Sequence, residues 1–234
     1  MTIIPMSTNT ALNDLSLLRV MQLASPTLPV GAYAQSQGLE WAVEAGWVNS
    51  EAALEDWLIM QLRDSLALLD LPVLARLHAA ALTLDDAQLQ CWSRYLLASR
   101  ETRELVADDC ERGKSLARLL SDLGVAAATP WVQRADTPFA ALSAIAAVDW
   151  QIPAPAAASA YAWGWLENQV LAGVKLIPLG QLAGQRLLLK LSPEIPPACA
   201  QALLLSDDDI GGSLPILALA SSLHETQYTR LFRS

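Results

Sequence analysis

The sequence predicts an all-α protein, a single-domain helical bundle of about eight to ten helices. Apolar residues recur at spacings of three and four along most of the chain, which is the pattern of helices that bury one face. Alternating strand patterns are almost absent, and β-branched residues are few. The 234 residues are enough to bury a full hydrophobic core without disulfides or metals.

Prolines and glycines divide the first part of the chain into helices. A first helix is expected from Leu15 until the prolines that begin at Pro26, and a second over about residues 36–45, closed by Gly46. The third is the clearest, because its apolar residues follow helical spacing closely. This stripe comprises Leu54, Trp57, Leu58, Leu62, Leu66, Leu69 and Val73.

The helices of the second part are expected from their capping residues. Thr83 is followed three residues later by an acidic residue, which predicts a capped helix start. A charged helix covers residues 100–118, and Thr137-Pro138 opens another, with proline at the first helical position. The longest helix follows Pro155 and ends before Pro178.

Three regions follow from this division. Residues 1–14 are expected to be a flexible N-terminal leader, and residues 15–206 the all-helical domain. Residues 207–234 are expected to be a linker, rich in Asp and Gly, followed by a C-terminal partner-binding tail. We expect this tail to be mobile in the isolated protein and ordered in a complex.

Composition excludes several classes of function. The net charge is −9, which argues against a nucleic-acid partner. Hydrophobic residues make up 53% of the chain, but the longest apolar run, at 154–177, is interrupted by Glu167-Asn168-Gln169. It is therefore interpreted as a buried helix rather than a membrane span. The three cysteines form no CxxC pair and no signal peptide is present, so a reducing cytoplasm is expected.

Two motifs come close to catalytic or nucleotide-binding patterns. Ala34-Gln35-Ser36-Gln37-Gly38 is similar to the GxSxG turn of serine hydrolases, but Ala34 replaces the first glycine and no strand precedes it. Gly113-Lys114-Ser115 ends like a P-loop, but Asp108 replaces the upstream glycine, and carboxylates inside the loop would repel phosphate.

A third motif comes close to a zinc site. His224-Glu225-Thr226-Gln227-Tyr228 has tyrosine where HExxH requires a second histidine, and His78 is the only other histidine in the chain. Neither a bound metal nor a catalytic pair of residues is expected. The residues alone therefore indicate a binding protein, with no cofactor and no enzymatic activity.

Four stretches together carry a family resemblance. They are residues 25–40 (SPTLPVGAYAQSQGLE), residues 101–105 (ETREL), residues 165–169 with 175–181 (WLENQ and KLIPLGQ), and residues 224–232 (HETQYTRLF). In this combination and order the chain resembles the UreF family of urease accessory proteins, from about residue 15 to its last residue.

The resemblance implies an all-α homodimer that acts as a nickel-insertion chaperone. Members of the family bind the accessory protein UreD, also called UreH, and together they recruit the GTPase UreG to apo-urease. They are thought to regulate GTP hydrolysis by UreG and to help pass the nickel cation along the complex. The nucleotide site then belongs to a partner, in agreement with the incomplete P-loop.

The resemblance also implies partner-binding residues. Tyr33 and Arg230 match family positions that face UreG, and Lys175 matches a basic position linked to faithful activation. The tail residues Tyr228, Leu231 and Phe232 match a segment that becomes ordered against UreD.

Physical chemistry agrees with this assignment for the turn and for Arg230. Tyr33 offers a flat apolar ring with a polar tip, Gly31 permits positive φ, and Arg230 can pair with a partner carboxylate. Ser36 is interpreted as shaping the turn or the interface.

Two alternatives remain beside the chaperone hypothesis. One is a helical dimerisation scaffold that binds itself but neither accessory protein. The other is a serine hydrolase that uses Ser36 with His224, for which Ser36→Ala would abolish turnover.

Overall fold

The computed structural model describes residues 12–234, and its architecture is entirely helical over that range. No strand occurs there, which confirms the predicted fold class. The expected leader falls largely on residues 1–11, which lie outside the described residues. Residue 14 already belongs to the first helix, and the side chain of Asn13 caps it by accepting from Ser16 N–H at 2.8 Å.

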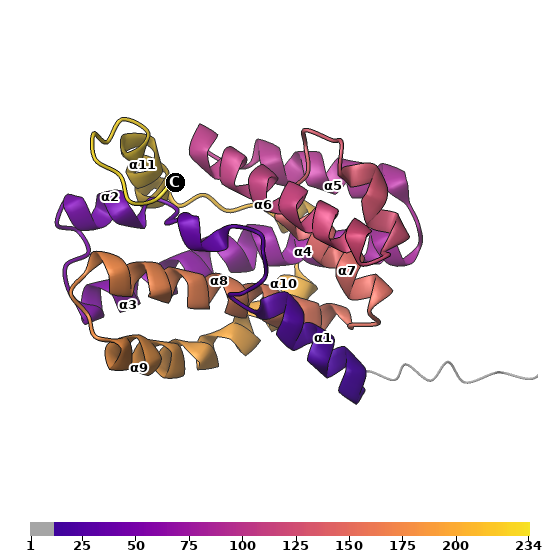
Figure 1. The fold of residues 1–234 in the computed structure, drawn as a ribbon, viewed down its shortest axis with the longest axis horizontal. Helices are drawn as coiled ribbons and strands as arrows, with labels where there is room; N and C mark the ends of the chain where they lie inside the picture. Colours follow the sequence, from indigo (N-terminus) through magenta and orange to yellow (C-terminus); the bar gives the residue numbers. More distant parts are fainter. Residues whose placement is uncertain (1–11) are drawn as a thin grey trace, which may run out of the picture.

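The helices follow one another with short connections (Figure 1). The α-helices are α1 (Asp14–Ala24), α2 (Leu39–Glu44), α3 (Glu51–Gln61), α4 (Leu71–Leu82), α5 (Asp86–Ala98), α6 (Arg103–Asp122), α7 (Phe139–Asp149), α8 (Ala154–Leu176), α9 (Gln181–Leu191), α10 (Ile195–Leu204) and α11 (Pro215–His224). Short 3-10 turns are η1 (Ala32–Ala34), η3 (Ala126–Trp131), η4 (Ser192–Glu194) and η5 (Asp207–Asp209).

Helices α3 and α4 belong to one continuous helix. The segment between them, Leu62–Asp70, is a π-helix, so the helix runs without a break from Glu51 to Leu82. Counted this way, residues 12–234 contain ten helices, within the predicted range. The apolar stripe of this helix was visible in the sequence, but the wider π-helical turn was not.

Helix α4 lies at the centre of the molecule and packs against α5, α7, α8 and α10 (Figure 1). Its leucines Leu71, Leu74 and Leu77 are fully buried, and burying each one stabilises the fold by about 1.5–3 kcal/mol. Alanines fill the facing side of α7, where every residue from Ala140 to Ala147 is buried. Small side chains let two helices approach closely, because the interaxial distance depends on the residues at the contact.

Gly113 in the middle of α6 serves the same purpose. An added Cβ at this position would lie 1.8 Å from the Thr137 carbonyl oxygen. The glycine of Gly113-Lys114-Ser115 therefore lets the start of α7 pack against α6. Because the motif lies inside a helix rather than in a loop, it does not form a phosphate cradle.

Two predicted helix starts are wrong by one or two residues. Thr83 is the C-cap residue of α4. The N-cap residue of α5 is Asp85, whose side chain accepts from Gln88 N–H at 3.0 Å. Asp85 competes successfully because Leu84 between them takes a positive φ of 57° and ends the preceding helix. Pro138 precedes α7 as its N-cap residue rather than occupying the first helical position.

The segment predicted as linker and tail contains a helix of its own. Helix α11 packs against α2 and α6, and buries Leu217, Ala220 and His224 (Figure 1). Before it, Tyr95 donates from its hydroxyl to the Ile210 carbonyl, and Gly211 N–H donates to Leu68 at 3.0 Å. Residues 207–234 are thus attached to the helical body along their length.

Candidate partner-binding surface

The candidate surface is built on the turn that joins α1 to α2. Gly31 has a left-handed backbone, with φ of 77°, and starts the 3-10 turn η1. An added Cβ at Gly31 would meet no atom within 4 Å, so backbone conformation rather than space favours glycine. The turn holds Tyr33 outward, with 70% of its surface exposed.

Residues 225–234 fold back across this turn. Arg233 N–H donates to the Ala34 carbonyl at 2.8 Å, and Ser36 N–H donates to the Ser234 carbonyl at 2.7 Å. The Ser36 hydroxyl donates to the same carbonyl. Backbone bonds therefore tie the segment that follows α11 to the turn that carries Tyr33.

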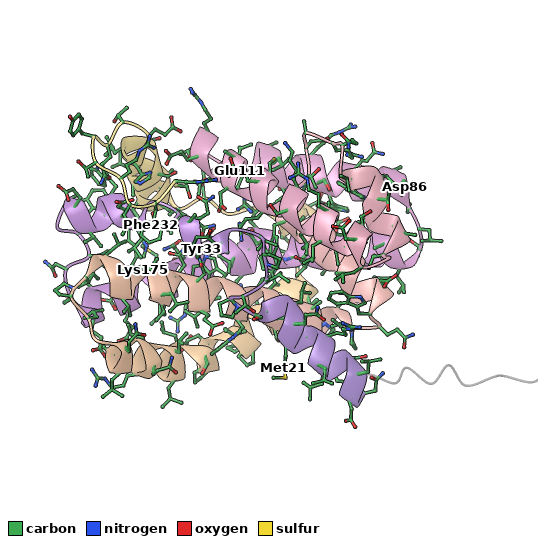
Figure 2. The ribbon with its side chains drawn as sticks, in the orientation of Figure 1. Met21, Tyr33, Asp86, Glu111, Lys175 and Phe232 are labelled. Atoms are coloured by element: carbon green, nitrogen blue, oxygen red, sulfur yellow. The ribbon has the colours of Figure 1, made fainter. Side chains whose placement is uncertain are left out.

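Phe232 anchors the segment in the interior. Its side chain is buried, and the Nζ atom of Lys175 lies 5.6 Å from its ring centroid. A cation over an aromatic face is attracted by about 0.5–1 kcal/mol at an exposed position. Lys175 is in the last turn of α8, where a positive charge also complements the helix dipole. Figure 2 shows Tyr33, Lys175 and Phe232 in the same half of the molecule, on the left of the view.

The predicted partner-binding residues that are exposed form what we call the turn–tail surface. They are Tyr33, Lys175, Tyr228, Arg230 and Leu231. Tyr228 is fully exposed and Leu231 is 67% exposed. Aromatic residues and arginine are enriched among residues that dominate binding energy at protein interfaces. Exposed apolar and cationic side chains on a fixed backbone are suited to a partner with apolar and acidic groups.

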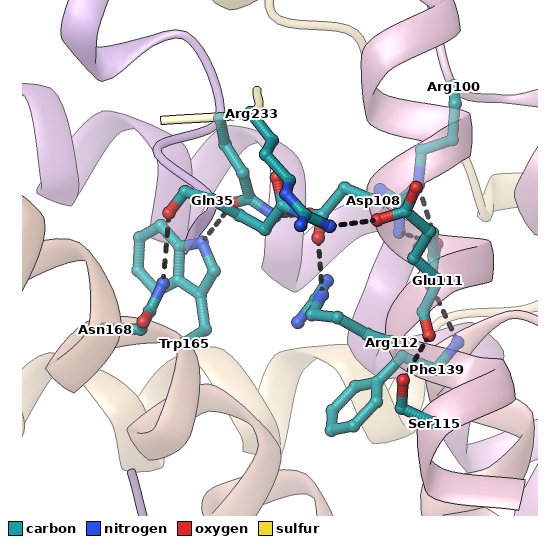
Figure 3. A network of polar contacts seen from close by, with 12 residues as sticks. Gln35, Arg100, Asp108, Glu111, Arg112, Ser115, Phe139, Trp165, Asn168 and Arg233 are labelled. Carbon is teal, nitrogen blue, oxygen red and sulfur yellow. Dashed lines mark hydrogen bonds and ion pairs between the residues drawn. The ribbon is translucent and has the colours of Figure 1, made fainter. Parts of the chain in front are cut away.

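A polar layer supports the turn from below (Figure 3). The Gln37 side chain donates to Asp108 Oδ2 at 2.9 Å and accepts from Trp165 Nε1 at 3.0 Å. Arg112 Nε donates to Asp108 Oδ1 at 2.8 Å, and Asn168 Nδ2 donates to the Gln35 carbonyl at 3.3 Å. The polarity of the turn, and of Asn168 and Gln169 within the Glu167-Asn168-Gln169 triplet, is thus largely used inside the protein.

Burial changes the acidity of Asp108. Desolvation raises the pKa of this carboxyl group, and the attraction of Arg112 opposes the rise only in part. Arg112 and Gln37 both donate hydrogen bonds to the buried Asp108 side chain, which offset the cost of burying it.

A second buried ion cluster lies beside this layer. Arg100 Nη2 contacts Asp70 Oδ1 at 2.6 Å and Asp109 Oδ2 at 2.7 Å, and both aspartates are buried. Burial alone would lower the pKa of Arg100, but the two carboxylates outweigh it and raise the pKa. Asp109 also accepts from Phe139 N–H at 2.8 Å, at the start of α7. The cluster therefore joins the end of the π-helical segment to α6 and to the start of α7.

Two predicted site residues are placed inside the protein rather than on its surface. Ser36 is fully buried and Phe232 is 5% exposed. Both hold the terminal segment in place, through a hydrogen bond to Ser234 and through apolar packing respectively. Gly31 acts through its backbone conformation.

Glu40 and Glu104 also hold the terminal segment, although neither is predicted from the sequence to be a site residue. Leu231 N–H and Phe232 N–H donate to the Glu40 carboxylate at 2.6 and 2.8 Å. Arg230 Nη1 contacts Glu104 at 2.7 Å. Each glutamate lies in the first turn of a helix. In the sequence, an acidic residue at this position indicates only a favourable interaction with the helix dipole. Only the fold reveals that residues almost 200 positions later meet Glu40.

Two further observations concern metals and membranes. Within the described range, no group of three or more His, Cys, Asp or Glu side chains could hold a metal ion. One helix there, Glu51–Leu82, is long and apolar enough to cross a membrane, but 61% of its apolar window is buried inside the protein. A largely buried helix of this kind is typical of a protein core.

The described residues form an all-helical protein, and its turn–tail surface has the composition expected of a partner-binding surface. The UreF family model matches residues 48–192. The urease accessory protein UreF of Alkalilimnicola ehrlichii is 54% identical over 216 residues, covering 92% of this chain and 95% of the relative. UreF of Pseudomonas putida is 53% identical over 224 residues, with coverages of 95% and 99%. UreF of an Azoarcus species is 52% identical over 234 residues, with coverages of 98% and 100%.

The chain therefore belongs to the UreF family of urease accessory proteins. The resemblance inferred from the sequence is confirmed. The similarity to the relatives extends over nearly the whole chain.

Proposed function

We propose that this protein binds UreD and that the pair recruits the GTPase UreG to apo-urease during nickel insertion. The observation that carries the proposal is the turn–tail surface, in which exposed Tyr33, Arg230 and Leu231 stand on a backbone tied down by Glu40, Ser36 and Phe232. A pre-ordered surface binds with a smaller entropic cost than a mobile one.

In this proposal the protein is a non-catalytic regulator of GTP hydrolysis in the cytoplasm, and needs no cofactor. The nucleotide belongs to UreG, and nickel is the cargo of the complex. Free Cys91, Cys110 and Cys199 are compatible with a reducing compartment. The acidic net charge agrees with the absence of nucleic acid among the partners.

Self-association as a homodimer is also proposed. Helix α1 exposes Leu15, Leu18 and Met21, each by about 60% of its surface. Exposed apolar side chains grouped on one helix are typical of an interaction surface.

The alternative of a serine hydrolase has little support. The Ser36 hydroxyl is fully buried and donates to the Ser234 carbonyl, while both ring nitrogens of His224 contact glutamates. A nucleophile needs a general base within hydrogen-bond reach, and these contacts occupy both groups.

Co-purification tests the proposal against a bare scaffold. The full chain should retain UreD, and UreG should bind the pair but not the chain alone. Cells that lack the protein should contain urease with little nickel. Self-association without UreD binding would favour the scaffold, and fully active urease in the deletion strain would refute the proposal.

A further inference from the structure

His224, the last residue of α11, is completely buried between two carboxylates. Its Nδ1 atom lies 2.7 Å from Glu104 Oε2 on α6, and its Nε2 atom lies 3.1 Å from Glu40 Oε2 on α2. The side chains of Glu40 and Glu104 are only 8% and 13% exposed. One imidazole ring therefore joins three helices through charged groups.

The same two carboxylates hold the terminal segment. Glu40 accepts from Leu231 N–H at 2.6 Å and from Phe232 N–H at 2.8 Å. The second oxygen of Glu104 contacts Arg230 Nη1 at 2.7 Å. A change in the charge of this cluster therefore changes the strength of the contacts that hold residues 230–232.

While Glu40 and Glu104 are both ionised, the geometry requires a protonated ring. A neutral imidazole has one N–H donor and one nitrogen lone pair, whereas ionised carboxylates only accept. With a neutral ring, a lone pair would face a carboxylate at one of the two contacts. The imidazolium donates at both, and with Arg230 it balances the two negative charges of Glu40 and Glu104.

The other charged groups nearby do not supply this balance. Helices α2 and α6 are the elements packed against α11. The only other charged residue of α2 is Glu44, which is exposed. At the start of α6, Arg103 donates its backbone N–H to Glu225 at 3.2 Å. Without a proton on His224, the buried cluster carries an uncompensated negative charge, which is costly.

We propose that His224 positions the terminal segment, and that its imidazolium form is required to hold residues 230–234 on the helical body. The docked segment binds the protonated ring, so docking is strongest at low pH. As the pH rises and the ring loses its proton, Glu40 and Glu104 repel each other and the segment is released. The consequence for partner binding rests on the proposed function, whereas docking itself does not.

Hydrogen exchange of the full-length protein measures docking directly. The protection factors of the Leu231 and Phe232 amides, corrected for the intrinsic exchange rate, should be compared across the pH range in which histidine titrates. We expect these factors to fall by about tenfold for each pH unit over which the docked state holds a proton that the released state has already lost. Constant protection over this range would overturn the proposal.

Glu104→Gln is the most informative variant. An amide can donate from its nitrogen to a neutral Nδ1 while its oxygen still accepts from Arg230, because these two contacts use different oxygens of Glu104. Docking should therefore persist at high pH and lose most of its pH dependence. A variant with the same pH dependence as the natural protein would contradict the proposal.

Two more measurements separate this role from general destabilisation. Glu225→Gln changes a neighbouring carboxylate that accepts only from Arg103 N–H, and should leave the pH dependence unchanged. The chain has two histidines, His78 and His224, so nitrogen NMR of the ring can be assigned with His78→Gln. A neutral His224 ring in the docked state would refute the proposal even if variants failed to fold.

Failure here and failure of the proposed function are distinguishable. If docking is independent of pH while the chain still recruits UreG with UreD, only the role of His224 is refuted. If docking follows the protonation of His224 but no partner binds, only the partner assignment is refuted.

Discussion

Gly31 determines how Tyr33 is presented. The left-handed backbone at this glycine turns the chain just before Tyr33, and no neighbouring atom restricts the space. Any other residue at this position has to adopt a conformation that L-amino acids rarely take. Ser36 and Phe232 are also understood residue by residue. Their sequence motifs predict partner-binding residues, but in the structure both side chains are buried.

Gly31→Ala should lower the free energy of unfolding by about 1–2 kcal/mol, because alanine is strained in the left-handed region. Denaturant unfolding of the full chain measures this change. Gly180→Ala is the matched control, since Gly180 also has open space around it but a negative φ of −74°. Equal effects of the two substitutions would show that backbone strain is not the reason for Gly31.

At the scale of elements, buried ion clusters rather than apolar contacts alone fix how the helices meet. Arg100 bridges Asp70 at the end of the π-helical segment and Asp109 in α6. The sequence predicts both segments as helical, but it does not predict the contact between them. A run of charged residues such as 100–118 indicates a solvent-exposed helix face rather than a buried ion cluster. Helix starts were predictable to within one or two residues, since competing caps such as Thr83 and Asp85 lie close together.

Arg100→Met should destabilise the protein by about 3–5 kcal/mol, because it leaves two buried carboxylates without a cation. The measurement is again the free energy of unfolding. Arg63→Met removes an exposed ion pair with Glu194, and should cost less than about 1 kcal/mol. A small effect of Arg100→Met would contradict a stabilising role for the cluster.

At the scale of the whole molecule, two segments almost 200 residues apart in the sequence meet at the proposed partner-binding surface. The turn after α1 and the segment after α11 are paired through backbone and side-chain hydrogen bonds. The motifs at 25–40 and 224–232 could be recognised separately in the sequence. Their contact could not, because nothing in either motif specifies that Glu40 accepts from Leu231 and Phe232.

This pairing changes the interpretation of the terminal residues. A tail of polar and apolar residues after an acidic linker reads as a mobile segment. In the structure, α11 and the returning chain are attached to α2 and α6, while the side chains of Tyr228, Arg230 and Leu231 stay exposed. Docking that depends on His224 would let the same segment exist in both states.

The central claim is that the turn–tail surface recruits UreG once UreD is bound. The most direct test is the affinity of UreG for the complex of UreD with Tyr33→Ala, compared with the natural chain. Leu84→Ala is the control, because Leu84 is 80% exposed and precedes Asp86, which Figure 2 places at the opposite end of the molecule. We predict that Tyr33→Ala weakens UreG binding by about 10–30-fold, as for an interface hot spot, with UreD binding and the unfolding free energy unchanged. Equal UreG affinity in Tyr33→Ala, Leu84→Ala and the natural chain would contradict the claim.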